Sequence, residues 1–287
     1  MKKFYFLTVL ILLSCSDKVG MQEFDSAEII KTIVLPKTIN ETSGLEFYNK
    51  NFITHNDSGD GPSLYVFNEN GDLIKTIDLN KDVNFEIENN DWEGIASDDK
   101  YLYVADTGNN FGNRSNLNIV RVNKEDDYKV DGIIEILYAD QETFFPRPKH
   151  KYDAEAILII DEQLVLFSKD RENLNTDLYL VDKFEKAAQK LTSEFDFNVN
   201  SLITGGDYKN ELHLLALVSY NSKGDQYLIL FERFDLEKLE ENTFKKYKIP
   251  LERAQIESIK IIDKNTFWVT SEDEGIGNPF MYKLKVK

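Results

Sequence analysis

Short apolar segments recur along the chain, and each is bounded by turn-forming residues. The clearest segments are rich in β-branched and aromatic residues, at Phe52–His55, Tyr101–Val104, Leu164–Phe167, Leu212–Leu215 and Thr266–Val269. A second set follows them, at Leu64–Phe67, Leu117–Val120, Leu178–Val181, Tyr227–Leu230 and Phe280–Lys283. This length and composition predict β-strands.

Polar turn residues precede the first set of segments in four places, at Tyr48–Asn51, Ser97–Lys100, Asp161–Gln163 and Asp263–Asn265. Each repeat therefore contains four strands, and four-stranded repeats at a spacing of about fifty residues are typical of β-propeller blades. The one helical candidate, Leu236–Glu241, is short and lies in a connection.

The number of repeats predicts the number of blades. The fifth repeat ends after its third strand, whereas Glu28–Leu35 forms a strand that precedes the first repeat and resembles Leu73–Leu79. Adding this N-terminal strand to the last blade completes five four-stranded blades and removes an exposed sheet edge. The predicted fold is therefore an all-β, five-bladed propeller. Six blades would need a further repeat, and a β-sandwich is the alternative architecture.

The N-terminus has the features of an export signal. Lys2 and Lys3 precede the apolar segment Phe4–Leu13, which is too short to span a bilayer. Leu12–Cys15 resembles the bacterial lipobox, and Cys15 is the only cysteine of the chain. We expect a signal peptide over 1–14, a lipidated flexible tether over 15–26 and one propeller domain over 27–287. The alternative is an ordinary secretory signal with a chance cysteine.

The resemblance to lipoproteins implies the bacterial outer membrane, facing the periplasm or the cell surface. The formal net charge is −17, from 51 acidic and 34 basic residues, and this balance disfavours nucleic acid as a partner. We expect a monomer that contacts the membrane only through its lipid and binds an unidentified small molecule or protein.

Acidic residues recur at the start of the innermost strand of each repeat. One column contains Glu93, Glu155 and Glu257, and the positions two residues earlier include Glu41, Asp91 and Asp153. Crowded carboxylates repel one another unless they are protonated or share a cation. Because Ca²⁺ takes six to eight oxygen ligands, these six residues are the predicted Ca²⁺ ligands. In the alternative interpretation they cap strand ends and pair with arginines.

The loops on the same face supply candidate ligand-binding residues. They contain Asp57, Asp106, Asn109, Lys169 and Arg171, and the proline-rich connection 144–152 adds Arg147, Lys149 and His150. That connection can equally be an ordinary one whose bases offset nearby acids. The sequence contains no Cys or His cluster for zinc, no Gly-x-Ser-x-Gly elbow and no phosphate-binding loop, so no catalytic residue is assigned.

Several motifs resemble those of the SdiA-regulated-type and phytase-esterase-like β-propellers. They are Glu41–Leu45, Asn56–Gly59, Asp91–Ile95, Tyr103–Asn110 and Asp153–Ile157. The resemblance covers the first three repeats and implies a calcium-binding propeller. Two functional classes are compatible with these observations. We favour a ligand- or protein-binding module; the alternative is a metal-dependent hydrolase, phosphoesterase- or phytase-like or lactonase- or esterase-like.

Overall fold

The computed structural model describes residues 25–81, 83, 85–251, 254–273 and 277–287. The predicted signal peptide, Cys15 and most of the predicted tether lie outside these residues. No helix in the described part of the chain is long and apolar enough to cross a membrane.

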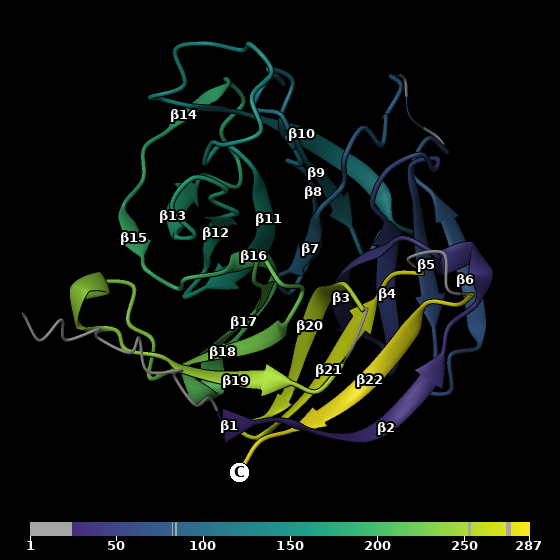
Figure 1. The fold of residues 1–287 in the computed structure, drawn as a ribbon. Helices are drawn as coiled ribbons and strands as arrows, with labels where there is room; N and C mark the ends of the chain where they lie inside the picture. Colours follow the sequence, from purple (N-terminus) through teal and green to yellow (C-terminus); the bar gives the residue numbers. More distant parts are fainter. Residues whose placement is uncertain (1–24, 82, 84, 252–253, 274–276) are drawn as a thin grey trace, which may run out of the picture.

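Five antiparallel sheets are arranged around a central axis, as Figure 1 shows. Blade one contains β3 (Thr42–Tyr48), β4 (Asn51–Asn56), β5 (Ser63–Phe67) and β6 (Leu73–Asp78). Blade two contains β7 (Gly94–Ser97), β8 (Tyr101–Asp106), β9 (Asn118–Asn123) and β10 (Lys129–Tyr138). Blade three contains β11 (Ala154–Ile160), β12 (Gln163–Ser168), β13 (Thr176–Val181) and β15 (Phe195–Phe197). Blade four contains β16 (Leu202–Lys209), β17 (Leu214–Tyr220), β18 (Gln226–Glu232) and β19 (Lys245–Ile249).

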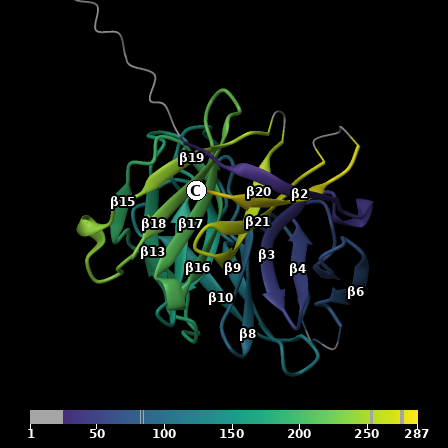
Figure 2. The same cartoon turned by 90° about the horizontal axis from the view of Figure 1, so that it is seen from below.

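Blade five closes the ring with strands from both ends of the described chain. Its order is β20 (Ile256–Asp263), β21 (Thr266–Ser271), β22 (Phe280–Lys285) and then β2 (Glu28–Val34). The N-terminal strand β2 pairs antiparallel with β22, from Glu28 opposite Lys285 to Val34 opposite Phe280. Figure 1 shows the two strands side by side, and Figure 2 shows β2 from below, near β20 and β21 of the same blade. The prediction of five four-stranded blades closed by the N-terminal strand is therefore confirmed.

Two short strands extend the outer edges of blades and were not predicted. β14 (Gln189–Leu191) pairs in parallel with β10, and β1 (Asp25–Ser26) pairs in parallel with β19. Asp25 and Ser26 were placed in the flexible tether by the sequence analysis. The backbone pairing with Tyr247 and Lys248 holds these two residues on blade four instead.

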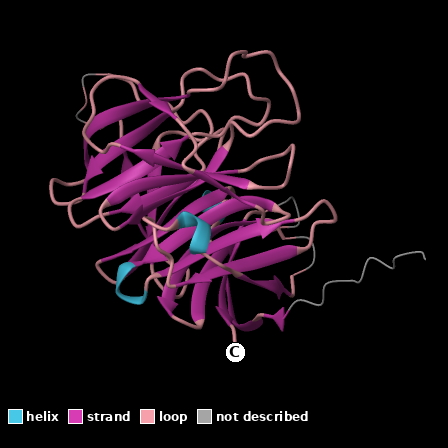
Figure 3. Cartoon of the chain, turned by 90° about the vertical axis from the view of Figure 1, so that its left-hand side faces the viewer, coloured by secondary structure: helices cyan, strands magenta, loops and turns pink. Residues whose placement is uncertain are grey.

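Local turn chemistry explains where several hairpins form. Asn49 and Lys50 join β3 to β4, and Asp161 and Glu162 join β11 to β12; all four have positive φ. Two-residue turns with positive φ match the twist of antiparallel strands. The predicted helix at Leu236–Glu241 was wrong in extent, because only a 3₁₀ turn forms there, η3 (Leu239–Glu241). Strands and loops make up nearly all of the molecule, as Figure 3 shows.

One strand boundary also differs from the prediction. β17 begins at Leu214, two residues later than expected, because Asn210–Leu212 form the 3₁₀ turn η2. The chain leaves this turn through His213, which has a left-handed backbone with φ of 46°.

The hydrophobic core is divided among the interfaces between blades. Each of five buried clusters joins two neighbouring sheets; for example, Leu178, Leu217 and Phe231 pack together between blades three and four. The innermost strands approach so closely that a Cβ on Gly205 would lie 2.6 Å from the carbonyl oxygen of Glu257. This tight packing fixes the backbone at the start of each inner strand, where the acidic columns lie.

Candidate functional site

The inner strands surround a narrow cavity on the propeller axis. Glu93, Glu155 and Glu257 come from three different blades and line this cavity, together with the glycines of the inner strands. Its volume is about 10 Å³, which is room for roughly one water molecule or one ion. A larger ligand must therefore lie across the mouth of the channel.

Hydroxyl groups from neighbouring blades hold the backbone beside these acids. Ser43 Oγ donates to the carbonyl oxygen of Glu93 at 2.9 Å, and Thr107 Oγ1 donates to that of Ala154 at 2.6 Å. Thr204 Oγ1 donates to the carbonyl oxygen of Ile256 at 2.5 Å. Each bond joins one blade to the next, so the acidic positions are set by the packing of the ring.

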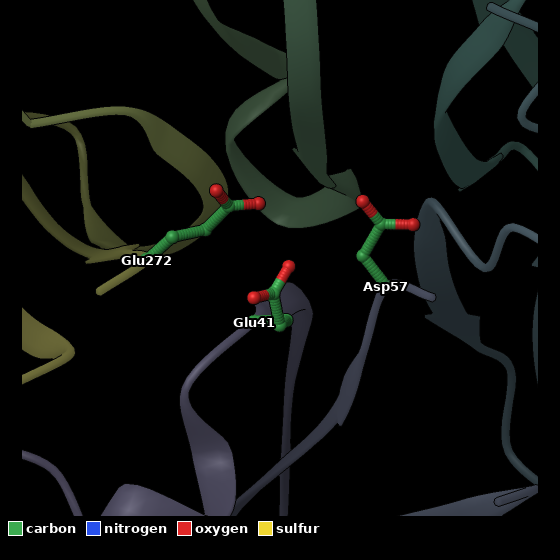
Figure 4. A group of neighbouring side chains, drawn as sticks. All are labelled: Glu41, Asp57 and Glu272. Carbon is green, nitrogen blue, oxygen red and sulfur yellow. The ribbon is translucent and has the colours of Figure 1, made fainter. Parts of the chain in front are cut away.

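Eight carboxylates gather at this end of the channel, and we call them the acidic mouth. They are Glu41, Asp57, Asp91, Glu93, Asp153, Glu155, Glu257 and Glu272. Oxygens from Glu41, Asp57 and Glu272 lie within 4.8 Å of one another. Figure 4 shows these three side chains converging from the first and last blades.

The second group of carboxylates in the mouth lies between blades one and two. Asp57, Asp91 and Glu93 each contribute an oxygen to a cluster in which these atoms are within 4.8 Å of one another. Within the described residues, no Lys or Arg lies within 4 Å of these three carboxylates. Gly108 covers them, and a Cβ at this position would overlap the carboxylates of Asp91 and Glu93.

In the third group of carboxylates, two of the three members form ion pairs with bases. Glu93, Asp153 and Glu155 form it, and all three are buried. Lys169 Nζ lies 2.7 Å from Glu155 Oε1, and Arg171 Nη2 lies 2.8 Å from Asp153 Oδ2. These two bases therefore pair with Glu155 and Asp153, whereas Asp57, Asp91 and Glu93 form no ion pair within the described residues.

Burial and mutual repulsion raise the pKa values of three carboxyls at the centre of the mouth. Burial, followed by the repulsion of Asp91, raises the pKa of Asp57 to about 9. Burial also raises the pKa of Glu155 to about 7, although Lys169 opposes this shift. The pKa of Glu93 is raised well above its usual range by burial and by Glu155 and Asp57. These acids are costly to ionise together in the absence of a cation.

Two residues of the acidic mouth, Asp57 and Glu257, have buried carboxylate oxygens without a hydrogen-bond partner among the described residues. Glu257 is 3% exposed, and neither of its carboxylate oxygens makes a well-directed hydrogen bond among the described residues, although the Gln255 side chain favours its charged form. Oδ1 of Asp57 is buried and equally without a hydrogen bond. Buried polar atoms are nearly always paired in native proteins, so these oxygens indicate a ligand such as a cation.

Three of the sequence-predicted ligand residues have their polar atoms engaged inside the protein. Asp106 accepts hydrogen bonds from Asn90, Asn118 and Arg114. Asn109 donates from its backbone to Asp153 Oδ1 at 2.7 Å. His150 is buried, and its Nδ1 accepts the backbone N–H of Tyr152 at 3.1 Å, which places its proton on Nε2 toward the carbonyl oxygen of Asn110.

The other two bases of that connection lie further out. Lys149 is exposed, and the guanidinium of Arg147 lies over the ring of Tyr152, 5.4 Å from its centroid. Lys169 and Arg171 instead reach into the acidic mouth. The structure therefore separates the predicted ligand residues into a buried framework, an outer loop and an inner pair of bases.

Glu272 was not among the predicted site residues, although its loop follows a second strand as the loops of Asp57 and Lys169 do. It follows the last residue of β21, just as Asp57 follows β4 and Lys169 follows β12. These three positions, with Thr107 after β8, form a further column in the repeat. Aligning the residues directly after each second strand would have identified Glu272.

The arrangement defines the chain as a five-bladed β-propeller with a cluster of acids at one end of its channel. The sequence matches no family model and no curated protein. Among solved structures, the chain is similar to a GH43 β-1,3-galactosidase determined with galactodeoxynojirimycin, with a TM-score of 0.53 and 10% identity over 90% of this chain and 94% of that one. It is also similar to a glucose dehydrogenase, with a TM-score of 0.49 and 8% identity over 91% of this chain and 99% of that one. At 10% identity, the likeness to the galactosidase shows the propeller fold alone.

Proposed function

We propose that the protein is an exported, membrane-anchored binding module whose acidic mouth holds Ca²⁺ and binds a ligand beside it. The observation that carries this proposal is the group Asp57, Asp91 and Glu93, whose carboxylates converge and form no ion pair within the described residues. The unpartnered oxygens of Asp57 and Glu257 support it independently.

The chemistry of the donors favours Ca²⁺ over a transition metal. All donors of the group are carboxylate oxygens, and hard cations prefer oxygen ligands in irregular arrangements. Histidine and cysteine, which zinc and copper favour, are absent from the group. The cation binds between blades one and two, because Lys169 and Arg171 already neutralise Asp153 and Glu155.

The membrane anchor and the family resemblance in this proposal are supported by the sequence alone. The lipobox-like run before Cys15 supports export to the outer membrane and attachment by lipid. The motifs that resemble SdiA-regulated-type and phytase-esterase-like propellers lie in the first three blades, which contribute six of the eight acids of the mouth. A bound ion would offer open coordination positions to the ligand.

Calorimetric titration of metal-free protein with Ca²⁺ tests the proposal. Asp57→Asn and Glu93→Gln should each weaken binding at least about tenfold, since each removes a charged ligand. Gly108→Ala should also weaken binding, because its methyl group would occupy the space of the carboxylates. Asp127→Asn is the matched control, since Asp127 is an exposed acid in the turn between β9 and β10 and does not belong to the acidic mouth. Absence of binding heat in the unmutated protein would contradict the proposal.

A hydrolase is the second candidate function, and one observation favours it. Lys169 and Arg171 lie beside the acidic group, so the mouth offers positive charge to an anion next to acids that can exchange protons. A bound cation would add a Lewis acid at this place. Hydrolysis of phosphoesters, esters or lactones that requires Ca²⁺ and is lost in Lys169→Met would favour this function. Absence of turnover with all of these substrates would contradict the hydrolase and leave the binding module as the proposed function.

A further inference from the structure

Three exposed phenylalanines lie on the loops beside the acidic mouth. Phe111 is 58% exposed, Phe144 is 41% exposed and Phe145 is 80% exposed. Phe111 is in the loop 107–117 of blade two, and the other two are in the connection 139–153 from blade two to blade three. We call these three residues the phenylalanine rim. Three exposed rings on adjoining loops exceed the scattered apolar residues of an ordinary surface.

Hydrogen bonds place the phenylalanine rim next to the acidic mouth. The backbone N–H of Arg147 donates to the carbonyl oxygen of Phe111 at 2.8 Å, which joins the two loops. Asn110, the neighbour of Phe111, accepts a hydrogen bond from Arg171 at 2.5 Å, and its amide lies 3.5 Å from Asp91 Oδ2. One residue therefore separates the phenylalanine rim from the carboxylates and the guanidinium of the mouth.

Buried side chains hold both loops in place. Gln141 Nε2 donates to the carbonyl oxygen of Gly112 at 2.8 Å, and the ring of His150 lies between Asn110 and Tyr152. The hydroxyl of Tyr152 donates to the carbonyl oxygen of Asp140 at 3.0 Å. Because these bonds fix both loops to the body of the protein, a ligand loses less free energy to loop ordering.

The charges around the phenylalanine rim favour a neutral ligand. An anion that lies across the channel would meet the eight carboxylates of the mouth. A cation stacked on the rings would meet Arg147 and Lys149 on the same connection. A neutral ligand avoids both repulsions, and it needs hydroxyl groups to satisfy carboxylate acceptors and the Arg171 donor.

We infer that this face binds a neutral carbohydrate whose apolar C–H face packs on the phenylalanine rim while its hydroxyl groups reach the acidic mouth. Aromatic rings contribute large, rigid contact areas of this kind. The axial cavity admits only a water or an ion, so the sugar lies across the mouth. The inference rests on the proposed function in one respect: hydroxyl oxygens would complete the coordination of the bound Ca²⁺.

Titration of the full chain with neutral cello-, laminari-, galacto- and manno-oligosaccharides, with Ca²⁺ and after its removal, tests the inference. Phe145→Ala should weaken binding at least about tenfold, and Phe145→Trp should retain it, because the larger ring keeps the stacking surface. Phe184→Ala is the matched control, since Phe184 is similarly exposed at 55% but lies beyond the other end of β13.

Each outcome separates the two proposals. Binding of Ca²⁺ without binding of any of these oligosaccharides would overturn the carbohydrate inference and leave the cation site intact. Binding of a sugar that needs no Ca²⁺, in a protein that takes up no Ca²⁺, would support the inference and overturn the proposed cation site. Equal sugar binding by Phe145→Ala and Phe184→Ala would overturn the stacking surface.

Discussion

Acidifying the metal-free protein from about pH 8 to about pH 5.5 should stabilise it, in contrast to proteins whose carboxylates are held by salt bridges. Five acids of the mouth have raised pKa values when folded, namely Asp57, Asp91, Glu93, Glu155 and Glu257. The folded state therefore binds more protons than the unfolded state over this range. Their stabilising contribution is therefore present below the unfolded pKa and lost as pH rises through the folded pKa.

Glu155 sets the size of the expected effect. Its pKa rises from 4.5 to about 7, mainly because burial disfavours its charged form. On acidification from about pH 8 to about pH 5.5, this single group adds about 2 kcal/mol to the free energy of unfolding. The figure follows from 1.36 kcal/mol per pKa unit and the protonated fraction of the group at each pH. For a domain of this size, this difference corresponds to roughly 4–8 °C in melting temperature. Asp57, with a pKa of about 9, changes stability in the same direction above neutral pH.

Thermal melts followed by circular dichroism, in buffer with EDTA, measure the effect. Glu155→Gln should flatten the dependence, because the substituted side chain does not titrate. Excess Ca²⁺ should stabilise the protein more at about pH 8 than at about pH 5.5, since protons and Ca²⁺ compete for the same oxygens. A melting temperature that falls on acidification would refute the reasoning about the mouth.

Three further predictions concern the frame of the molecule and its anchor. Lys260 Nζ bonds Glu46 at 2.9 Å and Asp207 at 2.8 Å across three blades, so Lys260→Met should destabilise the fold by about 3–5 kcal/mol in urea unfolding. The control Lys245→Met removes an exposed ion pair and should leave the urea midpoint nearly unchanged. Deleting 16–24 should leave the melting temperature unchanged, whereas deleting 16–36 removes β2 and should cause aggregation; equal melting of both would contradict closure by β2. Cys15→Ala should move the protein from the membrane to the soluble fraction, and unchanged fractionation would contradict lipidation.

Much of the propeller could be predicted because local and repeated signals agree. Asn49–Lys50 and Asp161–Glu162 form tight turns by their own backbone preferences, and the strands around them repeat in five places. The unmatched strand before the first repeat predicted closure, since a ring leaves one place for it. Local chemistry was insufficient at β17, where the 3₁₀ turn before His213 delays the strand, and at β1, whose pairing with β19 is long-range.

The candidate site could be predicted only as a region. The repeat placed the acids at the start of the inner strands, but the partners of each acid depend on neighbouring blades. Lys169 and Arg171 pair with Glu155 and Asp153 from the loop after β12, and no periodic pattern indicates which acids form no ion pair. Glu272 lies opposite Glu41 only because the last blade adjoins the first.

Locating the cation in a crystal of the Ca²⁺-loaded protein tests the central claim most directly. Terbium can replace Ca²⁺ for this purpose, because its anomalous scattering identifies the ion and its position. We predict one strong anomalous peak between the carboxylates of Asp57, Asp91 and Glu93, and its loss in Asp57→Asn. A peak elsewhere on the surface, or an acidic mouth that holds only water in these crystals, would contradict the account.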